Sequence, residues 1–246
     1  TNEIVIIKRD TAGSTGSPTS LSSSDLTLSE NFLYAGLCEL EDKTILCIHW
    51  VVEEVENKAN MIVHRSDENG ENWSLVSTNA IPTFGDIFPL SVANKNTFGS
   101  GVAGMDLSRV RIAAIGGQVL LLLKVLGHNT LNSIDRMIQM LSTNNGLTFE
   151  FVTENTTNNY IGMNLSVINN SFALSYIKAT NAEFSIFDNP SLPADSLELH
   201  EIEGTANIIG SPFVYQHNYE FTMWNDTDGQ IYSVFAEQSA NGRLFI

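Results

Sequence analysis

The chain has 246 residues, of which 43% are hydrophobic, and its 12 basic against 28 acidic residues give a formal net charge of −16. This length and apolar content suit one large domain or two small ones. The negative charge argues against a nucleic-acid partner and against binding to anionic lipid surfaces. The longest apolar stretch, Val119–Leu123, is too short to insert into a membrane. The chain opens at Thr1 with no Met, which predicts a processed product or a piece of a larger chain.

The first part of the chain differs in composition from the rest. Residues 11–24 are rich in Gly, Ser and Thr and lack apolar content, which is typical of an extended arm. We therefore predict an N-terminal strand and arm over residues 1–30 and a folded domain over residues 31–246. The pattern of Ile7-Lys8-Arg9, Gly16, Pro18-Thr19 and Leu21 also resembles the opening segment of bacteriophage tail-fibre proteins.

Almost every periodic segment predicts a β-strand, because short β-branched or aromatic runs alternate with Asn, Gly, Asp and Ser clusters. These runs are Ile4–Ile7, Thr44–Val52, Asn60–His64, Val119–Val125, Met137–Leu141, Phe172–Ile177 and Tyr219–Trp224. Gly116-Gly117 predicts a tight turn between two strands. The continuous leucine run that follows predicts a strand buried on both faces. No stretch has the length and apolar stripe of a helix, so the fold class is all-β.

The two cysteines predict a specific pairing in the next hairpin. If this hairpin turns at Asp42-Lys43, Cys38 lies directly opposite Cys47 at a non-hydrogen-bonded site. Such a site is close enough for a disulfide, at the short end of the allowed range. The alternative is two reduced thiols packed as small hydrophobic groups.

A repeated motif gives more information about the architecture. The segments Ser66–Trp73 and Ser142–Phe149 share the skeleton Ser-x-(Glu/Asn)-x-Gly-x-x-(Trp/Phe), and each lies between two β-runs. A third, poorer copy is Asn225–Tyr232. The skeleton resembles the Asp-box, or BNR repeat, of the sialidase superfamily, written Ser-x-Asp-x-Gly-x-x-Trp. The residues carried over as structural Asp-box positions are Ser66, Glu68, Gly70, Trp73, Ser142, Asn144, Gly146 and Phe149.

The resemblance implies a sialidase-like β-propeller in which the Asp-box lies on the face away from the active site. In each box the polar side chains bond loop amides, Gly supplies a positive φ and the aromatic residue packs between sheets. A complete six-bladed domain at this spacing needs more residues than the chain has. The number of blades, an incomplete ring and a ring completed by sequence outside this chain all stay open. A β-sandwich with two similar hairpins is the alternative fold.

The resemblance also implies three arginines that grip a carboxylate, but the chain shows no match to the family's first-blade arginine motif. Its six arginines are dispersed, and Arg109 and Arg111, which could share one strand face, are interpreted as a solvated pair. No catalytic residue is therefore carried over. The histidines are scattered and no nucleotide or metal motif occurs, so we predict no cofactor and no metal.

Two functions of different classes follow. The first is a non-enzymatic module on an extracellular or virion surface, part of a larger chain or a homo-oligomer, that binds a glycan or a surface protein in host recognition or assembly. Its candidate glycan-stacking residues are Trp50, Tyr215, His217 and Trp224. The second is a degenerate or atypical glycoside hydrolase, sialidase-like in fold, which would need two carboxylates in one cleft. Its candidate carboxylates are Asp86, Asp106, Asp135 and Asp188. The sequence favours binding without cleavage.

Overall fold

The structure is a computed structural model, and every structural statement below concerns the residues that it describes. These are residues 4–8, 16, 19–21, 35–53, 58–68, 70–80, 105–127, 136–155, 161–178, 181–201, 219–225, 230–237 and 243–245. They form strands almost throughout, and the helix among them is the three-residue 3₁₀ helix η1 (Ala194–Ser196). No helix in this part of the chain has the length and apolar character to cross a membrane.

Most strands form consecutive antiparallel sheets, which we call blades. Blade 1 contains β3 (Ala35–Glu39), β4 (Ile45–Glu53), β5 (Lys58–Ser66) and β6 (Trp73–Ala80). Blade 2 contains β7 (Met105–Ile115), β8 (Gln118–Gly127), β9 (Arg136–Ser142) and β10 (Glu150–Asn155). Blade 3 contains β11 (Ile161–Ile168), β12 (Ser171–Lys178), β13 (Asn181–Phe187) and β14 (His200–Glu201). Blade 4 contains β15 (Tyr219–Asn225), β16 (Ile231–Glu237) and β17 (Arg243–Phe245).

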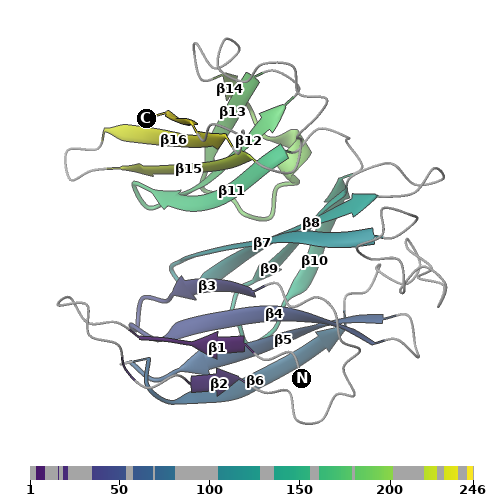
Figure 1. Ribbon diagram of the computed structural model, residues 1–246, viewed down its shortest axis with the longest axis vertical. Coiled ribbons are helices and arrows are strands. Elements are labelled where there is room, and N and C mark those ends of the chain that lie inside the picture. Colours follow the sequence, from purple (N-terminus) through teal and green to yellow (C-terminus); the bar gives the residue numbers. More distant parts are fainter. Residues whose placement is uncertain are drawn as a thin grey trace.

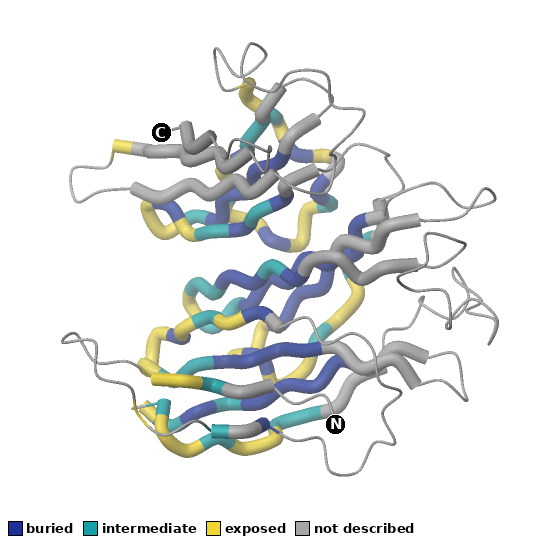
Figure 2. Tube along the Cα trace, in the orientation of Figure 1, coloured by how far each residue is buried: buried dark blue, intermediate teal, exposed yellow. Residues whose placement is uncertain are grey.

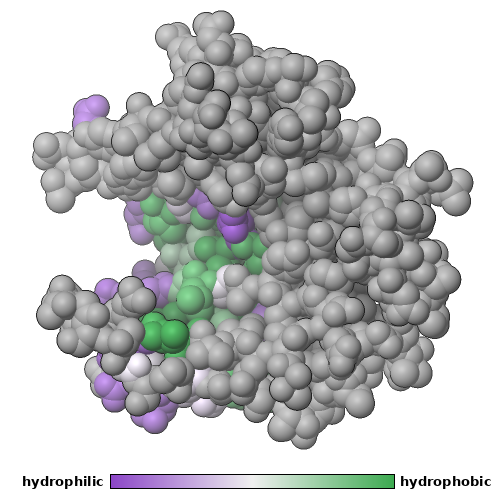
Figure 3. All heavy atoms as spheres, viewed as in Figure 1, coloured by the Kyte–Doolittle hydropathy of each residue, from purple (hydrophilic) through white to green (hydrophobic). Residues whose placement is uncertain are grey.

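The blades are arranged around an axis. Along each blade the strands follow chain order, and the first strands contact one another, since β3 contacts β7, β7 contacts β11 and β11 contacts β15. The blades therefore follow one another along an arc with their first strands innermost (Figure 1). Figure 3 shows a hollow at the left of the view, and many of the coloured residues at its floor are hydrophobic. Radial four-stranded sheets with innermost first strands are the β-propeller arrangement that the sequence predicts.

The N-terminal segment forms a separate small sheet. In it β1 (Ile4–Ile6) pairs antiparallel with β2 (Thr19–Leu21). Residues 22–34, which contain the predicted boundary between arm and domain, lie outside the described residues. The division at residue 30 stays a prediction.

Strand β8 carries the core, because it is buried on both faces as its leucine run predicts. Val119, Leu121 and Leu123 pack against blade 1, and Leu120 and Leu122 pack against blade 3. All five side chains are at most 1% exposed. Figure 2 shows the buried residues concentrated in the middle strands of the blades. Both faces of blade 2 are therefore covered by neighbouring blades, and that burial is the main stabilising contribution.

The predicted strands are confirmed, and so is the tight turn between β7 and β8. Ile115 pairs with Gln118 across Gly116 and Gly117, whose φ angles are 55° and 80°. Two positive φ angles in a two-residue hairpin are the type I′ geometry that glycine favours.

The predicted pairing of the two cysteines is wrong by one residue. Cys38 pairs with Leu46, and Cys47 pairs with Leu37. The turn has one more residue than predicted, because Lys43 takes a positive φ of 66° and the amide of Leu40 donates to the carbonyl of Thr44. A slip of one residue moves a side chain to the other face of a sheet.

Both cysteines are free, as in the alternative of two packed thiols. Cys38 packs against the core between blades 1 and 2, whereas Cys47 lies on the other face of blade 1. Burial raises the pKa of Cys38 to about 12 and the pKa of Cys47 to about 11, so both thiols stay protonated at neutral pH.

Replacing Leu121 by Ala tests the shared core between blades 1 and 2. Leu121 is 0% exposed, and the cavity left behind is expected to lower the free energy of unfolding by about 2–5 kcal/mol. Leu75→Ala is the matched control, since Leu75 is 56% exposed and its truncation is expected to cost at most about 0.5 kcal/mol. Denaturant titration of both variants measures the difference, and equal losses would contradict this packing.

Candidate functional site

The connections between strands divide each blade into two ends. Because neighbouring strands are antiparallel, the turns after β3, β5, β7, β9, β11 and β13 lie at one end, which contains both Asp-box segments. We call it the Asp-box end. Strands β4, β6, β8, β10, β12 and β14 run toward the opposite end, and the residues that follow them fall outside the described residues.

Both Asp-box segments join antiparallel strands, as predicted. The first connects β5 to β6, where Ser66 pairs with Trp73. The Oγ atom of Ser66 accepts a hydrogen bond from the amide of Ile45 at 2.8 Å. Gly70 has a φ of 69°, and its carbonyl accepts from Nε1 of Trp73 at 3.1 Å. Trp73 is half-buried, so the prediction of a largely buried aromatic holds only in part.

The second segment connects β9 to β10, and its serine bonds within its own turn. The Oγ atom of Ser142 accepts from the amide of Gly146 at 2.9 Å and donates to Oδ1 of Asn144 at 2.8 Å. That Oδ1 atom also accepts from the amide of Thr148 at 3.0 Å. Phe149 is half-buried and packs against the core between blades 1 and 2. Asn144 therefore acts as the acceptor that closes this turn.

The acceptor in the first segment is one residue earlier than the motif predicts. The carboxylate of Asp67 accepts from the amides of Glu71 at 2.9 Å and Asn72 at 3.3 Å. Asp67 thus takes the part that Asn144 takes in the second segment, while Glu68 is exposed. The sequence comparison selected Glu68 because Glu68 and Asn144 both lie two residues before the glycine of their segment. That spacing does not show which carboxylate turns inward. The third segment includes residues 226–229, which lie outside the described residues.

At the same end, a side chain from blade 2 holds the connection between β13 and β14 of blade 3. The side chain of Gln139 in blade 2 is 1% exposed. Its Nε2 atom donates to the carbonyls of Pro190 at 2.9 Å and Leu192 at 3.0 Å, and its Oε1 atom accepts from the amide of Ala194 at 3.0 Å. One buried amide thus holds the connection between β13 and β14 against blade 2. All these contacts organise turns.

Replacing Gly146 by Ala tests how the second Asp-box segment joins two blades. An added Cβ would lie 2.3 Å from Cδ1 of Leu46 in blade 1, and the φ of Gly146 is 79°. Gly116→Ala is the control, because Gly116 has a φ of 55° but its nearest neighbour would be 3.9 Å away. We expect the control to lose about 1–2 kcal/mol of unfolding free energy and Gly146→Ala to lose about 1–3 kcal/mol more. Equal losses in thermal or denaturant unfolding would show that the contact with Leu46 is unimportant.

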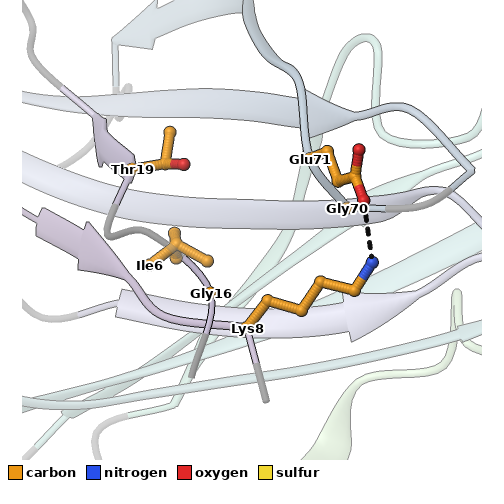
Figure 4. Close-up of a pocket in the computed structure, with 6 residues that line it drawn as sticks. All are labelled: Ile6, Lys8, Gly16, Thr19, Gly70 and Glu71. Carbon is orange, nitrogen blue, oxygen red and sulfur yellow. Dashed lines mark hydrogen bonds and ion pairs between the residues drawn. The ribbon is translucent and has the colours of Figure 1, made fainter. Parts of the chain in front are cut away.

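A cavity of about 270 Å³ also lies at the Asp-box end (Figure 4). It lies between the N-terminal arm and the first Asp-box turn, and Glu71 is the one carboxylate among its described lining residues. These residues are Ile6, Lys8, Gly16, Thr19, Gly70 and Glu71. Lys8 and Glu71 form an ion pair at 3.5 Å with side chains 51% and 66% exposed, which contributes little to stability. A single paired carboxylate does not make a glycosidase site, which needs two.

Two acidic residues lie near the starts of innermost strands, at the opposite end of the blades. Asp106 is the second residue of β7, and Glu220 is the second residue of β15. Both strands flank β11, and both begin at the opposite end. Asp106 was among the candidate carboxylates, whereas Glu220 was missed because its importance depends on β15 being the first strand of a blade. Innermost strand starts surround the axis, so these two positions define the candidate site.

The other candidate residues are placed less favourably. Asp188 is exposed just after β13, at the Asp-box end, so it does not join Asp106. Asp86 and Asp135 lie outside the described residues. Trp50 lies in β4 toward the opposite end, whereas Trp224 lies in β15 toward the Asp-box end. These two tryptophans are therefore not brought together. Tyr215 and His217 lie outside the described residues, and the proposed glycan-stacking set stays a prediction.

The interpretation of Arg111 as part of a solvated pair is wrong. Arg111 is half-buried on β7, and its Nε atom donates to the carbonyl of Met163 on β11 at 3.1 Å. Its Nη1 atom donates to the carbonyl of Val110 at 3.2 Å. This guanidinium therefore links the innermost strands of blades 2 and 3. Within the described ranges, no group of three or more His, Cys, Asp or Glu residues could hold a metal ion.

The fold is similar to that of several solved structures. The GH93 α-L-arabinofuranosidase of Fusarium graminearum in complex with arabinobiose superposes with a TM-score of 0.60 at 12% identity, over 97% of this chain and 70% of that one. An α-L-arabinanase of Penicillium chrysogenum, also with arabinobiose, gives 0.59 at 11% identity, over 98% and 71%. The sialidase of Trypanosoma rangeli gives 0.53 at 10% identity, over 99% and 38%. The fold is that of the sialidase-like β-propellers.

This chain spans only part of the length of these proteins, from 38% of the sialidase to 71% of the arabinanase. No protein-family model matches the sequence, and no curated protein matches it significantly. The comparisons correct the function favoured by the sequence. The similar structures described above are glycoside hydrolases, which contradicts the non-enzymatic virion module and gives the tail-fibre resemblance of the arm no support.

Proposed function

We propose that this chain is the propeller of a glycoside hydrolase that cleaves a neutral glycan. The similarity of nearly the whole chain to propellers that carry arabinobiose is the observation that carries the proposal. A second observation supports it. The turns at the Asp-box end are fixed by hydrogen bonds, and the innermost strands of the blades begin at the opposite end. An extracellular location fits a polymeric substrate and remains part of the proposal.

Asp106 and Glu220 are the proposed catalytic pair. They begin innermost strands of the two blades that flank blade 3, at the end away from the Asp-boxes. Glycoside hydrolysis uses one carboxylic acid to protonate the leaving oxygen and a second carboxylate as nucleophile or as base for water. Positions on separate blades can place two carboxylates on either side of a bond that lies over the axis.

Charge supports a neutral substrate over an anionic one. The net charge of −16 repels an anionic sugar unless it is reversed locally. A carboxylate-binding site needs convergent guanidinium groups with paired hydrogen bonds. Arg111, on an innermost strand, uses its Nε and Nη1 atoms on backbone carbonyls instead. A pentose or hexose polymer without acidic groups meets no such repulsion.

Hydrolysis assays with three variants test this function. The purified protein is incubated with linear arabinan, arabino-oligosaccharides, other neutral glycans and sialosides. We expect release of neutral sugars, and a loss of kcat of about 10²–10⁴-fold in Asp106→Asn and in Glu220→Gln. Asp188→Asn is the matched control, because Asp188 is an exposed carboxylate at the Asp-box end, and it should keep full activity.

Two outcomes would contradict the proposal. The first is a wild-type protein that hydrolyses none of the neutral glycans. The second is full activity in both Asp106→Asn and Glu220→Gln, which would place the chemistry elsewhere.

A further inference from the structure

Two histidines that are far apart in the sequence meet inside blade 1. His49 on β4 and His64 on β5 have stacked rings, with centroids 5.2 Å apart and an interplanar angle of 14°. Both residues are buried, since His49 is 2% exposed and His64 is 4% exposed. Neither Nδ1 atom has a hydrogen-bond partner in the structure. A buried pair of this kind is stable only while both rings are neutral.

The pair lies on the face of blade 1 that points away from blade 2. We call it the outer face, and its residues are Leu37, Cys47, His49, Ile62, His64 and Leu75. Cys47 pairs directly with His64, and His49 pairs with Ile62. Cys47 and Ile62 are both 0% exposed, so the middle of this face, where the histidines lie, is buried, whereas Leu37 and Leu75 are 53% and 56% exposed.

Two carboxylates beside this face of blade 1 are already paired with lysines. Glu39, at the end of β3, pairs with Lys43 at 2.7 Å, and both side chains are more than half exposed. Glu71 pairs with Lys8 beside the first Asp-box turn. Cys47 lies next to the pair on this face, and its raised pKa keeps it neutral. None of these three groups therefore compensates a proton on either ring.

We propose that the His49–His64 pair makes the outer face of blade 1 open reversibly in acid, while the core between blades 1 and 2 stays closed. Protonation charges the stacked rings, and the charged rings reach water only if the layer over them separates. The two faces of blade 1 respond differently, because the core between blades 1 and 2 is apolar and has no histidine among its members.

The pH range follows from the protonation of the two states. Burial, and then the charge on His64, lowers the pKa of His49 to about 4, and burial lowers the pKa of His64. In the open state both groups return to their ordinary value of about 6.5. The open state thus binds more protons, so the closed state loses stability as pH falls from about 6.5 toward 4. For each histidine, the opening constant rises at most about tenfold per pH unit in that range.

The two free cysteines report on the two faces separately. Cys38→Ser leaves Cys47 as the probe of the outer face, and Cys47→Ser leaves Cys38 as the probe of the core between blades 1 and 2. Each protein is labelled with 4,4′-dithiodipyridine, which reacts with thiols in acid, and each rate is divided by that of a cysteine peptide at the same pH. We expect the normalised rate of Cys47 to rise about tenfold or more between pH 6.5 and 4.5, while that of Cys38 stays unchanged.

Histidine variants decide whether the pair causes this rise. In the Cys38→Ser background, His49→Leu with His64→Leu should abolish the pH dependence of Cys47 labelling. His200→Asn is the matched control, because His200 is exposed and stacks on Phe184 in blade 3, and it should leave the rise intact. A rise that survives in the double variant would overturn the proposal, as would equal rises for Cys47 and Cys38.

A measurement on the unaltered protein covers the case in which the double variant does not fold. Proton NMR titration follows the imidazole signals of His49 and His64 in the wild type. We expect both to titrate below the ordinary value of about 6.5. Titration of both rings at or above that value would also overturn the proposal.

Discussion

The fold depends on the burial of both faces of each inner sheet. Strand β8 shows the constraint most clearly, because its odd-numbered residues fill the core with blade 1 and its even-numbered residues fill the core with blade 3. A sheet that is apolar on both faces must be covered on both sides. Each twisted sheet covers the sheet that comes next along the chain, and the first strands of the sheets then lie together. This arrangement produces the arc of blades around an axis.

That constraint assigns different tasks to the two ends of the blades. At the Asp-box end, short turns with positive φ angles, the two Asp-box segments and Gln139 fix the blades to one another. Gly146 lies against Leu46 of the neighbouring blade, so the turn also sets how closely the blades approach. The opposite end receives the starts of the innermost strands. Rigid strands that present residues from several blades at one end are a suitable frame for a catalytic site.

Much of the fold could be predicted from the sequence because local patterns determine it. Alternating apolar runs, the Gly116-Gly117 turn and the repeated Asp-box skeleton predicted strands, a hairpin and a propeller. Errors arose where one residue decides the outcome. Lys43 adopts a positive φ, lengthens its turn and moves Cys38 to the other face, and neither spacing nor composition signals this.

Features that depend on contacts between distant strands could not be predicted. His49 and His64 were treated as scattered, but the register of β4 and β5 stacks their rings. The position of Glu220 gains importance only when β15 is known to be the first strand of a blade. Function was misjudged for a related reason: the missing arginine motif excludes a sialidase-like grip on a carboxylate, but it does not exclude cleavage of a neutral glycan.

The most direct test of the central claim is where a neutral oligosaccharide binds. Hydrogen exchange of the wild-type protein is measured with and without a linear arabino-oligosaccharide. We expect slower exchange in peptides that contain the starts of β7 and β15, with no change in the Asp-box segments 66–73 and 142–149. Protection confined to the Asp-box segments would contradict the account.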